Sequence, residues 1–259
     1  MIKYIIKRLL ILIPILFAVS LLAFGLVRLM PGSAEMAYLQ AAGIPPSDEM
    51  MQTAKATLGL DRPFIVQYFE WLGKAVRFDF GTTYIGHKIV SEELFGALQN
   101  TMQLAGFASL LVLGISIPMG VLSAVRANKE LDNVNRVLAF VGSSMPSFWL
   151  GPLLVQLFCL TLGWLPVQGM GDFRNIILPS ITMAVLYIAT YSRVLRNSLL
   201  ENMNRRFVMY SRARGISSKK IITNHVLRTS MIPVVTTFGV NFGHMMAGTV
   251  VVEVLFSWP

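Results

Sequence analysis

Residues 210–215 read Tyr-Ser-Arg-Ala-Arg-Gly, and residues 225–228, which begin ten positions after the glycine, read His-Val-Leu-Arg. Both stretches lie in a basic loop, residues 193–228, that carries nine Lys or Arg and one acid, Glu201. A basic loop of this size between apolar segments is held on the cytoplasmic side of a membrane. Gly215 permits a left-handed turn between two short helices, which gives the loop the form of a docking element. The loop therefore predicts a transport subunit that is driven by a partner inside the cell rather than a self-contained enzyme.

The composition places the chain among polytopic membrane proteins. Of its 259 residues, 54% are hydrophobic and only 14% are charged, and the mean hydropathy is +0.62. The formal charge of +9 does not indicate nucleic-acid binding, because the basic residues stand beside apolar spans and not on a soluble surface. The chain has one cysteine, Cys159, so it can form neither an internal disulfide nor a metal site built from cysteines.

Charge-free runs predict five transmembrane helices and therefore an all-α bundle. A helix needs roughly 20 apolar residues to cross a bilayer core of about 30 Å. The runs place helices near residues 9–30, 101–125, 137–162, 176–196 and 230–254. A cleavable signal peptide is the alternative for the first run. Its 19 uncharged residues, Leu9 to Val27, exceed a usual signal core and end in no small-residue cleavage site, so we expect a span there.

The distribution of charge predicts that the N-terminus lies in the cytoplasm. With this orientation, 15 of the 22 Lys and Arg fall on the inner side, and nine of the 13 acids fall on the outer side. The chain then divides into an N-terminal end with the first span (1–30), an outer segment (31–100) and a membrane core (101–259). The chain stops on Ser-Trp-Pro just past a helix, so we expect the native protein to continue into a sixth span.

The outer segment contains the signals of short helices. Ser47, followed by Asp48 and Glu49, fits a helix N-cap with acids in the first turn. The stretch from Met50 to Phe80 is amphipathic and rich in aromatic rings, which favour the level of the lipid head groups. We expect either a lid that packs on the spans or a docking surface for an external binding protein, and the two interpretations are compatible.

Eight short motifs follow one another along nearly the whole chain. They are Tyr4-Ile5-Ile6-Lys7-Arg8-Leu9-Leu10, Leu58-Gly59-Leu60-Asp61-Arg62-Pro63, Val66-Gln67-Tyr68, Phe78-Asp79-Phe80-Gly81, Ser144-Met145-Pro146-Ser147-Phe148-Trp149-Leu150, Ile177-Leu178-Pro179, Arg212-Ala213-Arg214-Gly215 with His225-Val226-Leu227-Arg228, and Val252-Glu253-Val254-Leu255-Phe256-Ser257-Trp258-Pro259. Each motif alone is weak. In this order they resemble the inner-membrane permease subunits of binding-protein-dependent ABC importers, in the dipeptide, oligopeptide and nickel branch.

The resemblance implies a fold similar to type I ABC importer permeases, in a bacterial inner membrane. It implies as partners a homologous second permease, two cytoplasmic ATPase subunits and an extracytoplasmic substrate-binding protein. ATP and Mg²⁺ would bind to the ATPase subunits, and we expect no cofactor on this chain. The chain has no phosphate-binding loop of its own, since the nearest stretch, Gly81 to Lys88, continues with Ile89 instead of Ser or Thr.

The cytoplasmic motif of such permeases reads Glu-Ala-Ala, three residues, Gly, nine residues, Ile-x-Leu-Pro. This chain keeps the glycine, the nine-residue spacing, one alanine and the leucine, but it lacks the glutamate and has Arg228 in place of the proline. The residues that the resemblance assigns to ATPase coupling are Tyr210, Arg212, Ala213, Arg214, Gly215 and Leu227. A loop that is basic only because of its topology would explain the charges but not the spacing around the glycine.

The last two predicted helices supply the candidate translocation path. Gly239 and Gly243 form a small-residue stripe that permits close contact with a neighbouring helix. The candidate path residues are Asn241, His244, Met245 and Met183. A histidine within a span is a functional candidate, and imidazole suits nickel, so His244 is also the candidate metal ligand. A hydrogen bond from His244 to a neighbouring helix is the simpler alternative.

The predicted substrate is nickel, as the ion or a chelate, delivered by an extracytoplasmic binding protein. The short outer loop, residues 163–174, resembles that of nickel permeases, and so does the stretch from Asp48 to Tyr84. Dipeptide or oligopeptide import is the alternative within the same branch. Two interpretations come from other classes: a membrane scaffold or sensor that translocates nothing, and an independent channel.

Overall fold

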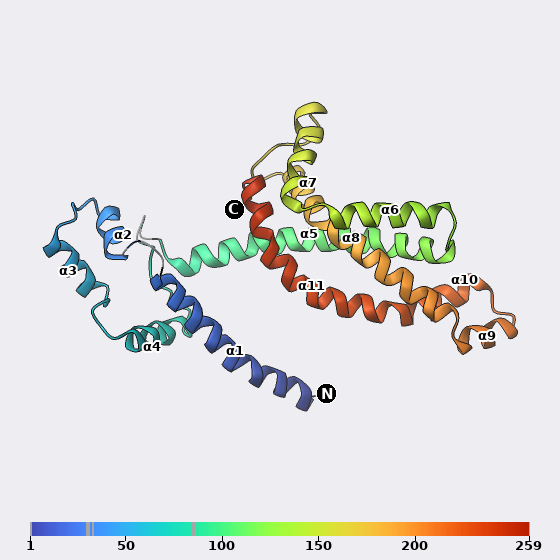
Figure 1. Ribbon diagram of the computed structural model, residues 1–259, viewed down its shortest axis with the longest axis horizontal. Coiled ribbons are helices and arrows are strands. Elements are labelled where there is room, and N and C mark those ends of the chain that lie inside the picture. Colours follow the sequence, from blue (N-terminus) through green and yellow to red (C-terminus); the bar gives the residue numbers. More distant parts are fainter. Residues whose placement is uncertain (1, 30–31, 33, 84–85, 87, 259) are drawn as a thin grey trace. The chain divides into compact units, whose positions relative to one another are not determined.

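The computed structural model describes residues 2–29, 32, 34–83, 86 and 88–258 and divides into two compact units, Met1–Gly96 and Ala97–Pro259. The regular structure of these residues is helical, apart from an isolated antiparallel bridge between Thr82 and Ile89 (Figure 1). This confirms the all-α prediction. Of the stretch compared with a phosphate-binding loop, Tyr84, Ile85 and His87 lie outside the described residues.

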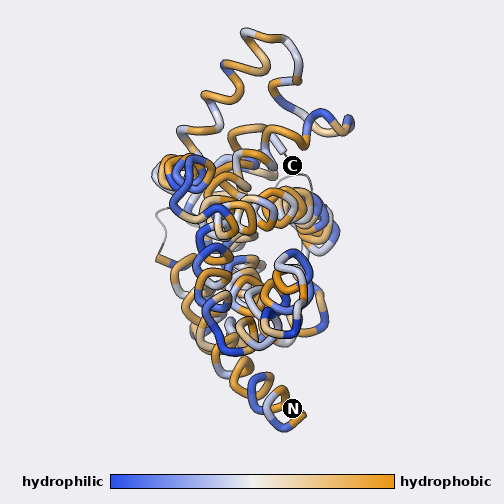
Figure 2. Tube along the Cα trace, turned by 90° about the vertical axis from the view of Figure 1, so that its right-hand side faces the viewer, coloured by the Kyte–Doolittle hydropathy of each residue, from blue (hydrophilic) through white to orange (hydrophobic). Residues whose placement is uncertain are grey.

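The first unit is built on one long apolar helix. Its helices are α1 (Ile2–Leu29), α2 (Ala34–Ala41), α3 (Asp48–Thr57), α4 (Phe64–Ala75) and the first turns of α5 (Val90–Val125). None of the residues of α1 is buried within the chain, although its mean hydropathy is that of a membrane span. Figure 2 shows hydrophilic colour beside the N-terminal label, where the lysines of α1 lie, and mostly hydrophobic colour in the turns that follow. This pattern is typical of a helix whose surface is covered by lipid or by another subunit.

Aromatic side chains join α4 to α1. The Tyr68 ring is 1% exposed, and it packs edge-on against Phe17 and Phe24 with ring centroids 5.6 Å apart in each pair. The Tyr68 hydroxyl lies 2.7 Å from the Ser20 hydroxyl, so its polar end is satisfied. The rings of α4 therefore act first as a packing face on α1, which favours the lid interpretation of this helix.

Helix α3 confirms the predicted cap. Ser47 accepts a hydrogen bond from the backbone N–H of Met50, and Asp48 and Glu49 occupy the first turn. The helix ends at Thr57 with Leu58 as its C-cap, and the φ of 66° at the following Gly59 allows the backbone N–H of Leu60 to reach the carbonyl of Lys55. This pairing is the Schellman motif, in which a left-handed residue closes the last helical turn.

The second unit is a bundle around one central helix, α8. Its helices are the remainder of α5, then α6 (Glu130–Ser144), α7 (Ser147–Leu154), the π-helical η1 (Val155–Thr161), α8 (Phe173–Met203), α9 (Arg206–Ala213), α10 (Ser218–Ile221), the π-helical η2 (Ile222–Val226) and α11 (Leu227–Phe256). Helix α8 packs against both α6 and α11 (Figure 1). It buries 13 residues, more than any other helix of the described chain, so it carries the core of this unit.

Four helices are long and apolar enough to cross a membrane, and a fifth crossing is possible only as a bent pair. The four are Ile2–Leu29, Val90–Val125, Phe173–Met203 and Ser218–Phe256. Each contains or largely covers the span predicted at its place. The prediction of one helix at 137–162 is wrong, because Glu130–Ser144 and Ser147–Thr161 meet at an angle of 106°.

Pro146 explains the break. It lacks a backbone N–H and disfavours helical conformation in the residue before it. Met145 accordingly has an extended backbone, with φ −91° and ψ 115°. Proline in a membrane helix is tolerated where neighbours satisfy the freed backbone groups, but here the chain changes direction instead.

The last span begins earlier than predicted. Helices α10, η2 and α11 run without interruption from Ser218 to Phe256, so the residues after the basic turn and the membrane span form one continuous rod. At the other end of this rod, Glu253 accepts a hydrogen bond of 2.7 Å from the Thr101 hydroxyl of α5. This contact joins the end of α11 to the neighbouring helix α5.

Candidate functional site

The glycine-centred stretch of the basic loop folds into a helix–turn–helix that we call the basic turn, residues 206–221. Gly215 has φ 73° and follows α9, as the predicted left-handed turn requires. The N–H of Gly215 bonds to the carbonyl of Arg212, and the N–H of Ile216 bonds to the carbonyl of Ser211. These two bonds make a Schellman motif, which fixes the direction in which the chain leaves α9.

An apolar cluster fastens the basic turn to the bundle. Val208 of α9 and Ile221 of α10 are at most 2% exposed, although both belong to a strongly basic segment. The buried members of the cluster are Ala124, Leu195, Leu199, Val208, Ile221, Val226 and Val234. They come from α5, α8, α9, α10, η2 and α11. Because interiors pack closely, a displacement of the basic turn is transmitted to the helices that share this cluster.

The outer surface of the basic turn combines aromatic, thioether and guanidinium groups. Tyr210 and Met209 are 65% and 66% exposed, and the Arg214 guanidinium lies 5.7 Å from the centre of the Tyr210 ring. Arg212 and Ala213 are also exposed. An exposed surface of this composition is typical of protein–protein interfaces, in which Tyr, Met and Arg are enriched. Leu227 differs from the other predicted coupling residues, because it is partly buried against the apolar cluster and supports the turn from behind.

A cavity of about 310 Å³ lies where α6 and α7 meet at an angle. The residues around it are Ser143, Ser144, Met145, Pro146, Ser147, Leu150, Thr182, Met183, Leu186, Tyr187, Met245, Gly248 and Val252. None of them carries a formal charge at neutral pH. Hydroxyls and thioethers on an otherwise apolar wall suit a ligand that is bound loosely and released again, rather than one that is held by ion pairs.

The structure separates the four candidate path residues. Met183 of α8 and Met245 of α11 both line the cavity. Asn241 and His244 do not line it, and the His244 side chain is exposed. Among the residues that the structure describes, no group of three or more His, Cys, Asp or Glu could hold a metal ion.

The serines of the cavity are site residues that the sequence argument missed. Ser143, Ser144 and Ser147 flank Met145-Pro146, and all three line the cavity at the break between α6 and α7. The signal was present in the sequence, since a proline in a serine-rich stretch of a predicted span marks a break.

Comparison with known proteins was made over the whole chain. Residues 116–259 match the family described as binding-protein-dependent transport system inner membrane component, and residues 1–105 match its N-terminal membrane component. The glutathione transport system permease protein GsiC of Escherichia coli (strain K12) is 35% identical over 259 residues, which is 100% of this chain and 84% of that protein. The proteins of the same name from Salmonella typhi and Shigella flexneri serotype 5b are 35% and 34% identical over the same shares.

Proposed function

Because the chain belongs to the inner membrane components of binding-protein-dependent transport systems, we propose that it forms one half of a path for short peptides and that its basic turn receives the driving ATPase. Family membership makes it a permease subunit of an ABC importer of the inner membrane. The peptide substrate, the coupling role of the basic turn and the cytoplasmic position of the N-terminus are the parts that we add.

One observation carries the proposal: the cavity and the basic turn are built on the same two helices. Helix α8 lines the cavity with Thr182 and Met183 and leads at its other end into α9. Helix α11 lines it with Met245 and is continuous with α10 at the other side of the turn. A partner that moves the basic turn therefore moves two walls of the cavity, and ATP binding to that partner can shift the population between two arrangements.

The substrate proposal replaces nickel by a short peptide. The relatives named above carry the name of a transport system for glutathione, which is a tripeptide. The cavity offers hydroxyls and apolar surface but no charged group, which suits a peptide with several hydrogen-bonding groups better than a bare divalent cation. The findings thus favour the peptide alternative, and His244 becomes a packing or interface residue.

Uptake in cells that carry the complete transport system, with and without this chain, tests the substrate. We expect chain-dependent uptake of radiolabelled glutathione or dipeptide that excess unlabelled nickel does not reduce. Chain-dependent nickel uptake that resists peptides would return the protein to the nickel assignment.

Gly215→Glu tests the coupling role against a scaffold or an independent channel. The substitution places a charged side chain at a left-handed position on the exposed turn, where a Cβ itself meets nothing within 4 Å. We expect normal membrane insertion together with loss of substrate-stimulated ATPase activity and of uptake. Gly59→Glu is the matched control, since Gly59 has a similar φ and equally open surroundings in the first unit. Unchanged stimulated ATPase in Gly215→Glu would refute the coupling role, and flux without any ATPase partner would indicate a channel.

A further inference from the structure

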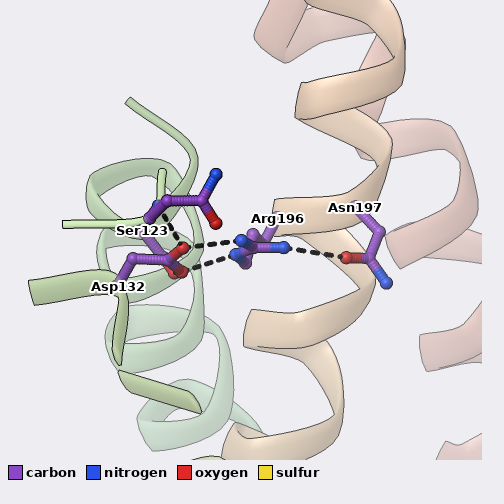
Figure 3. Close-up of polar contacts among 5 residues, drawn as sticks. Ser123, Asp132, Arg196 and Asn197 are labelled. Carbon is purple, nitrogen blue, oxygen red and sulfur yellow. Dashed lines mark hydrogen bonds and ion pairs between the residues drawn. The ribbon is translucent and has the colours of Figure 1, made fainter. Parts of the chain in front are cut away.

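A buried ion pair joins three helices beside the basic turn. Arg196 of α8 reaches across to Asp132 of α6 and binds both carboxylate oxygens, with Nε–Oδ1 and Nη2–Oδ2 distances of 2.6 Å (Figure 3). The carboxylate also accepts hydrogen bonds from the Ser123 hydroxyl of α5 and, at 2.8 Å, from the backbone N–H of Asn128. The Asp132 side chain is 0% exposed and that of Arg196 is 15% exposed. We call this set the three-helix joint.

The Asp132 carboxylate makes more directional contacts than the packing of α6 against its neighbours requires. Four donors surround one carboxylate, and the turn that supplies one of them holds Asn128 in the left-handed conformation with φ 61°. Apolar residues of similar volume often stabilise a buried position as well as an ion pair does or better, so a buried pair is weak evidence for stability alone. What bidentate bonding adds is direction, because it fixes the planes and the register of the two partners.

The three-helix joint lies on the two helices that lead to the cavity, and one of them also leads to the basic turn. From Asp132, α6 runs to Ser143 and Ser144 at the cavity, about 18 Å away at 1.5 Å per helical residue. From Arg196, α8 runs in one direction to the cavity and in the other to the basic turn. Tight contact continues along the pair, since a Cβ on Gly142 of α6 would lie 3.1 Å from Val185 of α8.

We propose that Asp132 and Arg196 are positioning residues of the transport cycle, which make α5, α6 and α8 move as one body and so carry movement of the basic turn to the broken helix at the cavity. Without the joint, α8 would slide past α6. The side of the cavity that carries Ser143 and Ser144 would then remain in place while the side that carries Met183 moved. The inference rests on the proposed coupling role of the basic turn. It adds that α5, α6 and α8 move together with the basic turn, a role that neither the family nor the names of the relatives assign.

Two variants test the joint in the complete complex, reconstituted with its ATPases and binding protein. Arg196→Lys keeps the charge but loses bidentate geometry, and the double variant Asp132→Asn with Arg196→Gln removes both charges, so that neither leaves a lone buried carboxylate. We expect both to assemble, to keep ATP hydrolysis that responds to loaded binding protein, and to lower the peptide transported per ATP hydrolysed by about threefold or more, the size of typical coupling effects. Glu201→Gln is the matched control, because Glu201 lies on the same helix as Arg196 and forms an exposed ion pair with Arg205, which lies just beyond the end of α8.

A second readout reports movement directly. Spin labels at Val137→Cys and Arg193→Cys, in a Cys159→Ser background, measure the distance between α6 and α8. We expect one narrow distribution with and without ATP in the otherwise unaltered complex, and a broader, ATP-dependent one in the joint variants. Unchanged transport per ATP in the complexes that do assemble, even if fewer assemble, would overturn the proposal and leave the pair a stabilising contact. Failure of the proposed coupling role is a separate result. It would appear as unchanged stimulated ATPase activity and uptake when Gly215→Glu is the only substitution in the complex.

Discussion

The two halves of α8 differ in chemistry although they belong to one helix. The half near Met183 contributes apolar and hydroxyl side chains to a neutral cavity. The half from Arg193 onward holds a buried ion pair and part of an apolar cluster. The first half gains its function from neighbours far away in sequence, whereas the second half leads into a turn whose shape is encoded locally. One helix therefore links the proposed substrate site to the proposed contact with the ATPase partner.

Separating α8 from α5 tests whether the helix acts as one body, and we expect the largest effect here. Gly120 of α5 leaves no room, since a Cβ would lie 3.0 Å from both Leu195 Cβ and the Ser192 carbonyl oxygen. Gly120→Leu should destabilise the bundle by roughly 1–3 kcal/mol, as overpacking does, and should lower the amount of assembled complex. Thermal inactivation of the complex in detergent measures the stability, and immunodetection of the chain in isolated membranes measures the amount assembled.

Gly114→Leu is the control for Gly120→Leu, because it lies on the same helix in open surroundings and its side chain would be exposed within the chain. Equal loss in the two variants would show that close contact with α8 is not what Gly120 provides.

Gly215→Ala tests the local half of the comparison. The methyl group meets no atom within 4 Å, so the substitution acts only on the left-handed backbone, at a cost of roughly 1–2 kcal/mol. Gly59→Ala applies the same strain to the same kind of helix end in the first unit. We expect stimulated ATPase activity to fall in Gly215→Ala alone. An equal fall in both variants would attribute the effect to general stability.

Met183→Trp tests the cavity half. The larger side chain fills space that the proposed peptide uses, so uptake should fall by about tenfold, the effect of one badly fitting group in a binding site. ATPase activity without substrate should stay unchanged, because the basic turn is untouched. Kinetics of peptide uptake check this, and a parallel loss of unstimulated ATPase would show that the two halves of α8 are not functionally separable.

Arg214→Gln should have the smallest effect. The guanidinium is exposed and lies over the Tyr210 ring, so it steers the partner more than it holds it. We expect the association rate of the ATPase to fall about twofold to fivefold and its dependence on salt to weaken. Surface plasmon resonance at two ionic strengths measures both, and a variant with the wild-type salt dependence would remove Arg214 from the interface.

Local signals in the sequence were sufficient for much of the fold. The charge-free runs predicted four of the five span regions as helices, Ser47 marked the cap of α3, and Gly215 marked the left-handed turn. Each of these features depends on side chains within a few residues of one another, or on the period of a single helix. The break at Pro146 was visible as a proline but was read as tolerated, because sequence alone does not show whether neighbours satisfy the freed backbone groups.

The candidate site divides along the same line. The residues proposed for coupling, from Tyr210 to Gly215, could be picked out from their spacing, but the partly buried position of Leu227 could not. Met183 and Met245 both line the cavity, so their place on the path stays a prediction that the cavity supports, whereas His244 was singled out by rarity and does not line it. Asp132 gave no signal, since an acid in a short polar loop is normally solvated.

The sequence by itself determined that this chain is a helical membrane protein with a basic, glycine-centred turn, because hydropathy, charge asymmetry and the left-handed preference of glycine act locally. The tertiary structure decided which residues meet: three serines and three methionines around a cavity, and Asp132 with Arg196 across 64 positions of the chain. These contacts follow from how a broken helix packs on α8. Packing direction depends on the summed fit of many side chains, none of which records its partner in the residues beside it.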